Sequence, residues 1–183
     1  MRVFSQLMMR NKMKVEEMPL TVVGSPTITD GVVSGFDSNN KLQAPINNWS
    51  WNKIEYQFRI KFDSTSGYRV FVTDSKNIYG QVYNTNTIYI GYFDNTNTLK
   101  NLYQKTGTSV DTWVDVRVML DKIANNGKVW INDELLADKT ELNINNTTLG
   151  TTNIGNTFNG GSIDFNNSYI VIDGTKYIFT LPE

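Results

Sequence analysis

The feature that most constrains the fold is a period-two alternation of apolar and polar side chains. Its apolar members are Ile54, Tyr56, Phe58, Ile60 and Phe62, and the polar members between them are Glu55, Gln57, Arg59 and Lys61. Successive side chains of a β-strand point to opposite faces, so this pattern predicts a strand with one buried and one solvated face. The alternation returns over residues 114–120. Both segments therefore favour an antiparallel sheet with one wet face.

Short strand-like segments continue through the rest of the chain, separated by loops rich in Asn, Thr and Gly. Tight hairpin turns are predicted at Asn132-Asp133 and Asp173-Gly174, because Asn, Asp and Gly tolerate the positive φ of two-residue turns. Further strands are predicted at residues 20–23, 31–36, 68–73, 78–83, 88–93, 98–104, 161–165 and 168–172. No helical periodicity is convincing after Leu20. The predicted fold is all-β, an antiparallel two-sheet jelly-roll sandwich.

The residue types that are missing exclude much chemistry. The 183-residue chain contains no cysteine and no histidine, which excludes disulfides, thiolate metal sites and catalytic triads that use histidine. Its net charge of −1 gives no global field for binding nucleic acid. No apolar run reaches the roughly 20 residues that cross a bilayer, so we expect no membrane span, and we expect no signal peptide. No cofactor and no metal are assigned.

The start of the chain differs in composition from the rest. We therefore predict an N-terminal arm at residues 1–19 and a sandwich domain at residues 20–183. Five of the six methionines lie in the first 18 residues, beside several basic residues. The arm is either a frayed end or an anchor, with a short helix as one form, that packs on another subunit. Because thioethers adapt to irregular pockets, the anchor would use Phe4, Leu7, Met8, Met9, Arg10 and Met13.

Three stretches of sequence together resemble the concanavalin A-like, laminin-G-type jelly-roll family. They are residues 22–36 (VVGSPTITDGVVSGF), residues 112–118 followed by 127–135 (TWVDVRV, GKVWINDEL), and residues 154–165 (IGNTFNGGSIDF). The family places an Asn-Gly or Asp-Gly turn in the middle hairpin, where this chain has Asn132-Asp133. The closing stretch, residues 161–179, is similar to domains of bacteriophage virion proteins. The resemblance implies a jelly roll in a tail, baseplate or head-fibre protein.

An enzymatic role would require paired carboxylates, because glycosidases hold two of them about 5–9.5 Å apart. Glucanases that share this resemblance carry a Glu-x-Asp-x-Glu strand, which points three carboxylates into one cleft. Here Glu55 is followed on the same face by Gln57 and Arg59. The chain is therefore predicted to be no enzyme, and glycoside hydrolysis is the weakest alternative.

Carbohydrate binding needs only an aromatic face ringed by amides and carboxylates. Asn48, Trp49, Trp51 and Asn52 provide these groups just before the strand at Ile54. The two tryptophans share one face if the chain is extended, whereas a bend at Asn52-Lys53 would turn both rings into the core. Trp113 is predicted on the outer side or margin of its sheet, and we include it among the glycan-binding candidates.

A tyrosine-rich stretch and three aspartates are two further candidate sites. Tyr79, Tyr83, Tyr89, Tyr92 and Tyr103 could form a polar-aromatic binding surface, or simply the wet face of an antiparallel sheet, which is the favoured alternative. Asp37, Asp94 and Asp164 are conceivable calcium ligands, but no closely spaced oxygen cluster of the EF-hand kind is present.

The leading hypothesis is a non-enzymatic bacteriophage virion protein, a head fibre, decoration or tail adhesin that displays a lectin-like jelly roll. Its partners would be other virion subunits through the arm, further copies of itself, and a host-surface glycan. It would bind no nucleic acid. The alternative is a stand-alone carbohydrate-binding lectin module.

Overall fold

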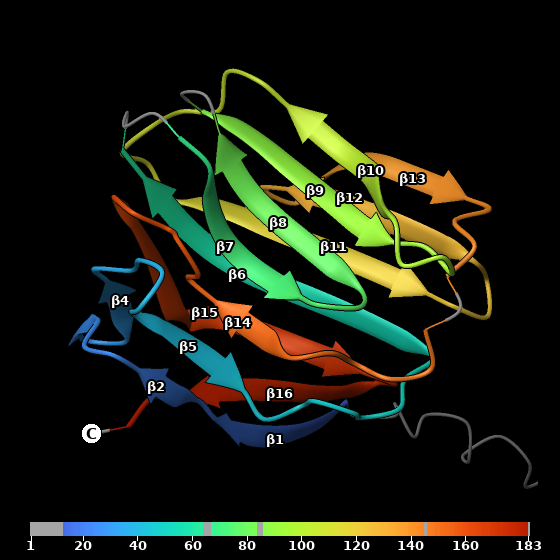
Figure 1. Cartoon of the computed structure of the whole chain (residues 1–183), viewed down its shortest axis with the longest axis horizontal. Coiled ribbons are helices and arrows are strands. Elements are labelled where there is room, and N and C mark those ends of the chain that lie inside the picture. The colour runs from blue at the N-terminus through green and yellow to red at the C-terminus, as the bar shows by residue number, and fades with distance from the viewer. Residues whose placement is uncertain (1–12, 64–66, 84–85, 145, 183) are drawn as a thin grey trace, which may run out of the picture.

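The fold is known from a computed structural model, which describes residues 13–63, 67–83, 86–144 and 146–182. These residues form sixteen β-strands in two sheets that stack face to face (Figure 1). None of them lies in a helix, so no helix of this part of the chain is available to span a membrane. The all-β two-sheet sandwich predicted from the sequence is confirmed.

The larger sheet contains nine strands and is antiparallel except at one edge. Its main order is β1 (Lys14–Pro19), β16 (Thr175–Thr180), β15 (Gly161–Ile172), β6 (Lys53–Phe62), β11 (Val114–Asp121), β12 (Asn126–Ile131) and β13 (Glu134–Thr140). Two short strands, β4 (Val32–Ser34) and β3 (Thr27–Thr29), branch from β15.

The second sheet contains seven antiparallel strands. Its order is β10 (Leu99–Lys105), β9 (Thr87–Phe93), β8 (Ile78–Tyr83), β7 (Arg69–Asp74), β14 (Thr152–Ile154), β5 (Lys41–Ala44) and β2 (Thr21–Val23). This sheet faces the viewer in Figure 1. The strands β10 and β13 are therefore edge strands, one in each sheet.

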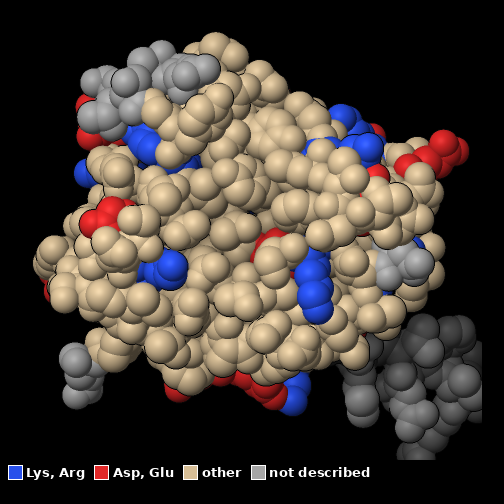
Figure 2. Space-filling view, viewed as in Figure 1, with Lys and Arg blue, Asp and Glu red and all other residues tan. Residues whose placement is uncertain are grey.

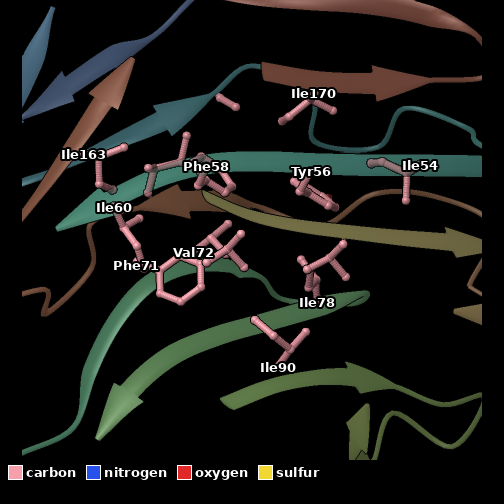
Figure 3. Packing of buried hydrophobic residues seen from close by; sticks show 14 of the residues in the cluster. Ile54, Tyr56, Phe58, Ile60, Phe71, Val72, Ile78, Ile90, Ile163 and Ile170 are labelled. Carbon is pink, nitrogen blue, oxygen red and sulfur yellow. The ribbon is translucent and has the colours of Figure 1, made fainter. Parts of the chain in front are cut away.

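The core fills the space between the two inner faces. The alternating apolar residues of β6 are all at most 1% exposed, as their pattern predicts. In Figure 3 they point toward Phe71, Val72 and Ile78 of the facing sheet. The rings of Phe58 and Phe71 meet edge to face, with centroids 6.3 Å apart. Aromatic and branched side chains from both sheets thus hold the layers together through burial of apolar surface.

Both predicted hairpin turns are present, and both residues of each turn have positive φ. The φ angles are 50° and 64° at Asn132 and Asp133, and 48° and 85° at Asp173 and Gly174. Positive φ at both central positions is typical of the type I′ turn, whose twist matches that of the flanking strands. The segments predicted as strands at residues 161–165 and 168–172 form the single strand β15, with a register shift between Asp164 and Tyr169.

The structure differs from the predicted arm at residues 1–19. Lys14–Pro19 form strand β1, which pairs in parallel with β16, and Met18 is only 2% exposed beside Phe179. The boundary at residue 19 is therefore wrong, because backbone pairing and the burial of Met18 place β1 in the sandwich. Met13 precedes β1 and is 54% exposed. The other predicted anchor residues, Phe4, Leu7, Met8, Met9 and Arg10, lie outside the described residues.

Candidate functional site

The outer face of the seven-stranded sheet carries a group of tyrosines that we call the tyrosine face: Tyr68, Tyr79, Tyr83 and Tyr89. On β8 the buried residues Ile78 and Val82 point inward, so Tyr79 and Tyr83 point outward. Tyr89 lies on β9 opposite Gln81 of β8, and Tyr68 directly precedes β7. Strand alternation alone therefore brings three of these rings to one surface.

The rings of the tyrosine face contact one another. Tyr68 and Tyr83 are stacked, with centroids 5.8 Å apart and planes inclined by 18°. Tyr83 meets Tyr89 edge to face at 6.5 Å. Because Tyr68 is 69% exposed, this stack presents aromatic surface to solvent. Ring contacts of this kind order the side chains before any ligand arrives, which lowers the entropy cost of binding.

Two phenol groups of this face, those of Tyr79 and Tyr89, remain protonated at neutral pH. Partial burial raises the pKa of Tyr79, and neighbouring Tyr89 raises it further. Burial likewise raises the pKa of Tyr89, with a further contribution from Tyr83. Each neutral phenol is both a hydrogen-bond donor and an acceptor, which suits a ligand rich in hydroxyl groups.

Uncharged polar side chains extend the tyrosine face across the sheet. Cross-strand pairing aligns Tyr79 with Thr73 of β7, Asn153 of β14 and Gln43 of β5 on the outer face. The Gln43 amide donates to the side-chain oxygen of Asn153 at 2.9 Å. Figure 2, which looks onto this sheet, shows a surface that is mostly uncharged, with charged side chains at several places, some of them next to one of opposite sign. The face thus combines aromatic rings with amides and hydroxyls and has little charge.

A buried carboxylate fixes the scaffold beneath this face. Asp74, at the end of β7, is fully buried. It accepts hydrogen bonds from Lys76 N (2.9 Å), Gly150 N (2.9 Å), Asn77 Nδ2 (3.1 Å), Tyr56 Oη (3.3 Å) and Thr152 Oγ1 (3.3 Å). Burial, together with the Asp74 charge, raises the pKa of Tyr56 well above 10, so this phenol remains a donor. The carboxylate joins β7 and β14 to β6 of the facing sheet and holds the β7–β8 turn in place.

The structure separates the two tryptophans of the predicted glycan site. The chain bends at Asn52, where the backbone N–H donates to Asp173 at 2.9 Å. Trp51 is 1% exposed in the core, so it offers no platform to a ligand, and this part of the prediction is wrong. Trp49 is 38% exposed and packs edge to face on Tyr177 at 5.5 Å. Asn48 lies beside it with a φ of 66°.

Trp113 lies over the outer side of the nine-stranded sheet, as predicted. Its ring is half-buried below Lys61 and Arg59, whose charged groups lie 5.4 and 5.9 Å from the ring centroid. Lys61 is near one end of β6, whereas Trp51 precedes the other end. At about 3.3 Å per residue these ends are roughly 30 Å apart, so the predicted tryptophan and asparagine set does not form one site.

The structure brings together some of the tyrosines that the sequence suggested as a polar-aromatic binding surface. Of the five tyrosines named from the sequence, Tyr79, Tyr83 and Tyr89 lie on the tyrosine face. Tyr92 points inward and is 8% exposed, and Tyr103 is half-buried beside the edge of the sheet. Tyr68 was not named as a binding candidate, although it is the first residue of the strand predicted at residues 68–73, a position that indicated a place at the sheet margin.

The acidic side chains of the described residues were also candidates for a metal site or for catalysis. No group of three or more acidic side chains in the described ranges could hold a metal ion. Asp115 and Asp164 both approach Arg59, at 3.5 and 3.7 Å, on the outer face of the nine-stranded sheet. The Arg59 guanidinium therefore lies within ion-pair distance of both carboxylates.

No protein-family model matches the chain, and no curated protein matches its sequence. Solved structures do match its fold. The receptor-binding domain of botulinum neurotoxin C/D mosaic serotype aligns with a TM-score of 0.67 at 13% identity, covering 84% of this chain and 42% of that one. The binding domain of botulinum neurotoxin DC in complex with SialylT aligns at 0.63 and 13% identity, over 84% and 42%. The same binding domain with rat synaptotagmin II aligns at 0.60 and 14%, over 84% and 43%.

These matches show a shared jelly-roll-like β-sandwich. The chain spans less than half the length of the matched domains, and the identity is low, so the likeness establishes the fold alone. The matched structures are binding domains of toxins, and none of the three bears on a bacteriophage origin.

Proposed function

We propose that this chain is a non-catalytic carbohydrate-binding module and that the tyrosine face is its binding surface. The observation that carries the proposal is the ordered stack of Tyr68, Tyr83 and Tyr89 on a mostly uncharged sheet face. Aromatic rings contact the apolar side of a sugar ring, and neighbouring amides and hydroxyls bond its hydroxyl groups. The low charge of the face favours neutral glycans.

The shared fold with toxin receptor-binding domains supports a binding role, since the neurotoxin DC domain was solved both with SialylT and with a protein receptor. Two carboxylates on the outer face of the nine-stranded sheet, Asp115 and Asp164, both lie within ion-pair distance of Arg59. We infer that the module binds its ligand without changing it.

The resemblance to virion domains predicts a setting for this module, namely display on a bacteriophage particle through the arm predicted at residues 1–19. This setting stays a prediction, as does assembly with further copies of the chain. A particle assembled with a chain that lacks residues 1–12 tests it. Normal incorporation of the shortened chain would contradict the anchor, and its loss from the particle would support it.

The carbohydrate proposal is tested by a glycan array followed by calorimetric titration of the neutral glycans that bind. Tyr83→Ala removes the central ring of the stack and is expected to weaken binding about tenfold, since the lost stacking and contact area amount to about 1.4 kcal/mol. Tyr68→Phe keeps the ring and should retain binding. Trp113→Ala, which removes an aromatic ring from the opposite sheet, is the matched control. Undiminished binding by Tyr83→Ala, or loss only in Trp113→Ala, would contradict the assignment.

A further inference from the structure

A pocket of about 460 Å³ opens at the side of the sandwich where the two edge strands face each other. Its walls are residues 101–104 of β10 and residues 136–139 of β13. Binding pockets for small molecules usually have volumes of about 300–1,000 Å³, so this pocket is large enough for one. It belongs to neither the tyrosine face nor the tryptophan sites.

Irregularities in both strands form the pocket. The pairing of β10 with β9 shifts register between Asn101 and Tyr103, and the pairing of β12 with β13 shifts between Val129 and Trp130. The first shift leaves Leu102 fully buried, and the second leaves Leu136 half-buried against the core. β-Bulges recur beside binding sites because they re-aim side chains. Here a bulge on each strand places a leucine in the wall of the same pocket.

The charges in the wall are already engaged within the protein. Asp138 forms an ion pair with Lys128 at 2.8 Å, and the Lys139 ammonium donates to the Asn101 carbonyl at 3.0 Å. Tyr103 adds an aromatic ring, and burial raises the pKa of its phenol, with a further contribution from Glu134. The amides of Asn101 and Gln104 and the phenol of Tyr103 give the same wall uncharged hydrogen-bonding groups, which suit a ligand rich in hydroxyl groups.

Strand pairing connects this pocket to the tyrosine face. Gln104 of β10 pairs with Tyr89, and Asn101 pairs with Gly91, which in turn pairs with Tyr79. Both β10 residues line the pocket. Neighbouring strands lie about 4.8 Å apart, so the pocket wall begins roughly 10 Å from β8, farther than one sugar ring reaches.

We infer that the pocket between β10 and β13 is a subsite for the terminal residue of a neutral oligosaccharide whose preceding residues lie on the tyrosine face. This inference rests on the proposed function. With such a subsite, the affinity of the module would depend on the length of the glycan and on its terminal residue, and isolated sugars would bind more weakly.

The test is a calorimetric titration with a length series of neutral glucan and galactan oligosaccharides, from monosaccharide to hexasaccharide. The unaltered protein should gain about tenfold in affinity at the length that reaches the pocket. Ala137→Phe fills the pocket, and the double variant Asn101→Ala/Gln104→Ala removes polar groups at exposed wall positions. Either variant should lose this gain while still binding the short sugars.

Tyr83→Ala is the matched comparison and should weaken binding at every length. If the pocket variants keep the full dependence on length, the subsite is wrong and the proposed function stands. If no oligosaccharide binds the unaltered protein, both fail. The thermal unfolding midpoint of Ala137→Phe shows whether this variant folds. If it does not fold, the double variant Asn101→Ala/Gln104→Ala decides the question.

Discussion

At the scale of single residues, buried or well-bonded carboxylates hold the loops beside the tyrosine face. Asp94 lies in the loop that joins β9 to β10. It accepts hydrogen bonds from Thr96 Oγ1 at 2.7 Å, from Thr96 N at 2.9 Å and from Thr98 N at 3.0 Å. Chiefly the Thr96 hydroxyl, with the backbone N–H groups and Lys100, lowers the pKa of Asp94 to about 2. An ionised Asp94 therefore holds the loop that leads into β10.

This carboxylate should make stability depend on acid. Its pKa is about 2 in the folded chain and 3.8 in an ordinary environment, so its stabilisation is complete above about pH 4 and is lost as pH falls through about 2. Urea unfolding at a series of pH values should show that, as pH falls over this range, the free energy of unfolding decreases more steeply for the natural chain than for Asp94→Asn. Equal slopes in the two proteins would contradict this role of Asp94.

At the scale of elements, the strongest sequence patterns gave the most accurate predictions. Alternation located β6 and β11, and turn chemistry located both type I′ hairpins. The strands β3 and β14, of three residues each, and β5, of four residues, escaped prediction because such short segments show little of a period. The direction of Trp51 depended on the bend at Asn52, which is held by Asp173, more than a hundred residues away in sequence. Such long-range hydrogen bonds leave no local signal.

The turn between β12 and β13 gives a prediction for one such element. Asp133 has a φ of 64°, where a side chain is strained and glycine is not. Asp133→Gly should raise the free energy of unfolding by about 0.5 kcal/mol. This net figure is the relief of backbone strain less the greater conformational entropy that glycine gives the unfolded chain. Gly174→Ala, at a φ of 85° in the other hairpin, should lower it by about 1 kcal/mol. Chemical denaturation measures both, and a destabilised Asp133→Gly would contradict the turn assignment.

At the scale of the whole molecule, the sandwich begins earlier in the chain than its composition suggests. The segment Lys14–Pro19 is mostly charged or exposed, yet it adds an edge strand to the last strand of the chain. No local pattern predicts this parallel pairing, because its partner lies at the opposite end of the sequence. The binding surface was predicted only as an alternative, since alternation identifies a wet face without showing which wet face is aromatic and uncharged.

The place of β1 in the domain is tested at its one buried side chain. Met18→Ala should lower the free energy of unfolding by about 2 kcal/mol, because it leaves a cavity beside Phe179. Met13→Ala, at a position that is 54% exposed, should change it by less than about 0.5 kcal/mol. Similar small effects for both substitutions would mean that the segment is an arm outside the core after all.

The central claim is that the tyrosine face is the carbohydrate-binding surface. Its most direct test is an NMR titration of the aromatic ring signals with a neutral oligosaccharide selected by the array. We expect the shifted signals to belong to Tyr68, Tyr79, Tyr83 and Tyr89. Shifts confined to Trp49 and Trp113, or to residues of the nine-stranded sheet, would contradict it.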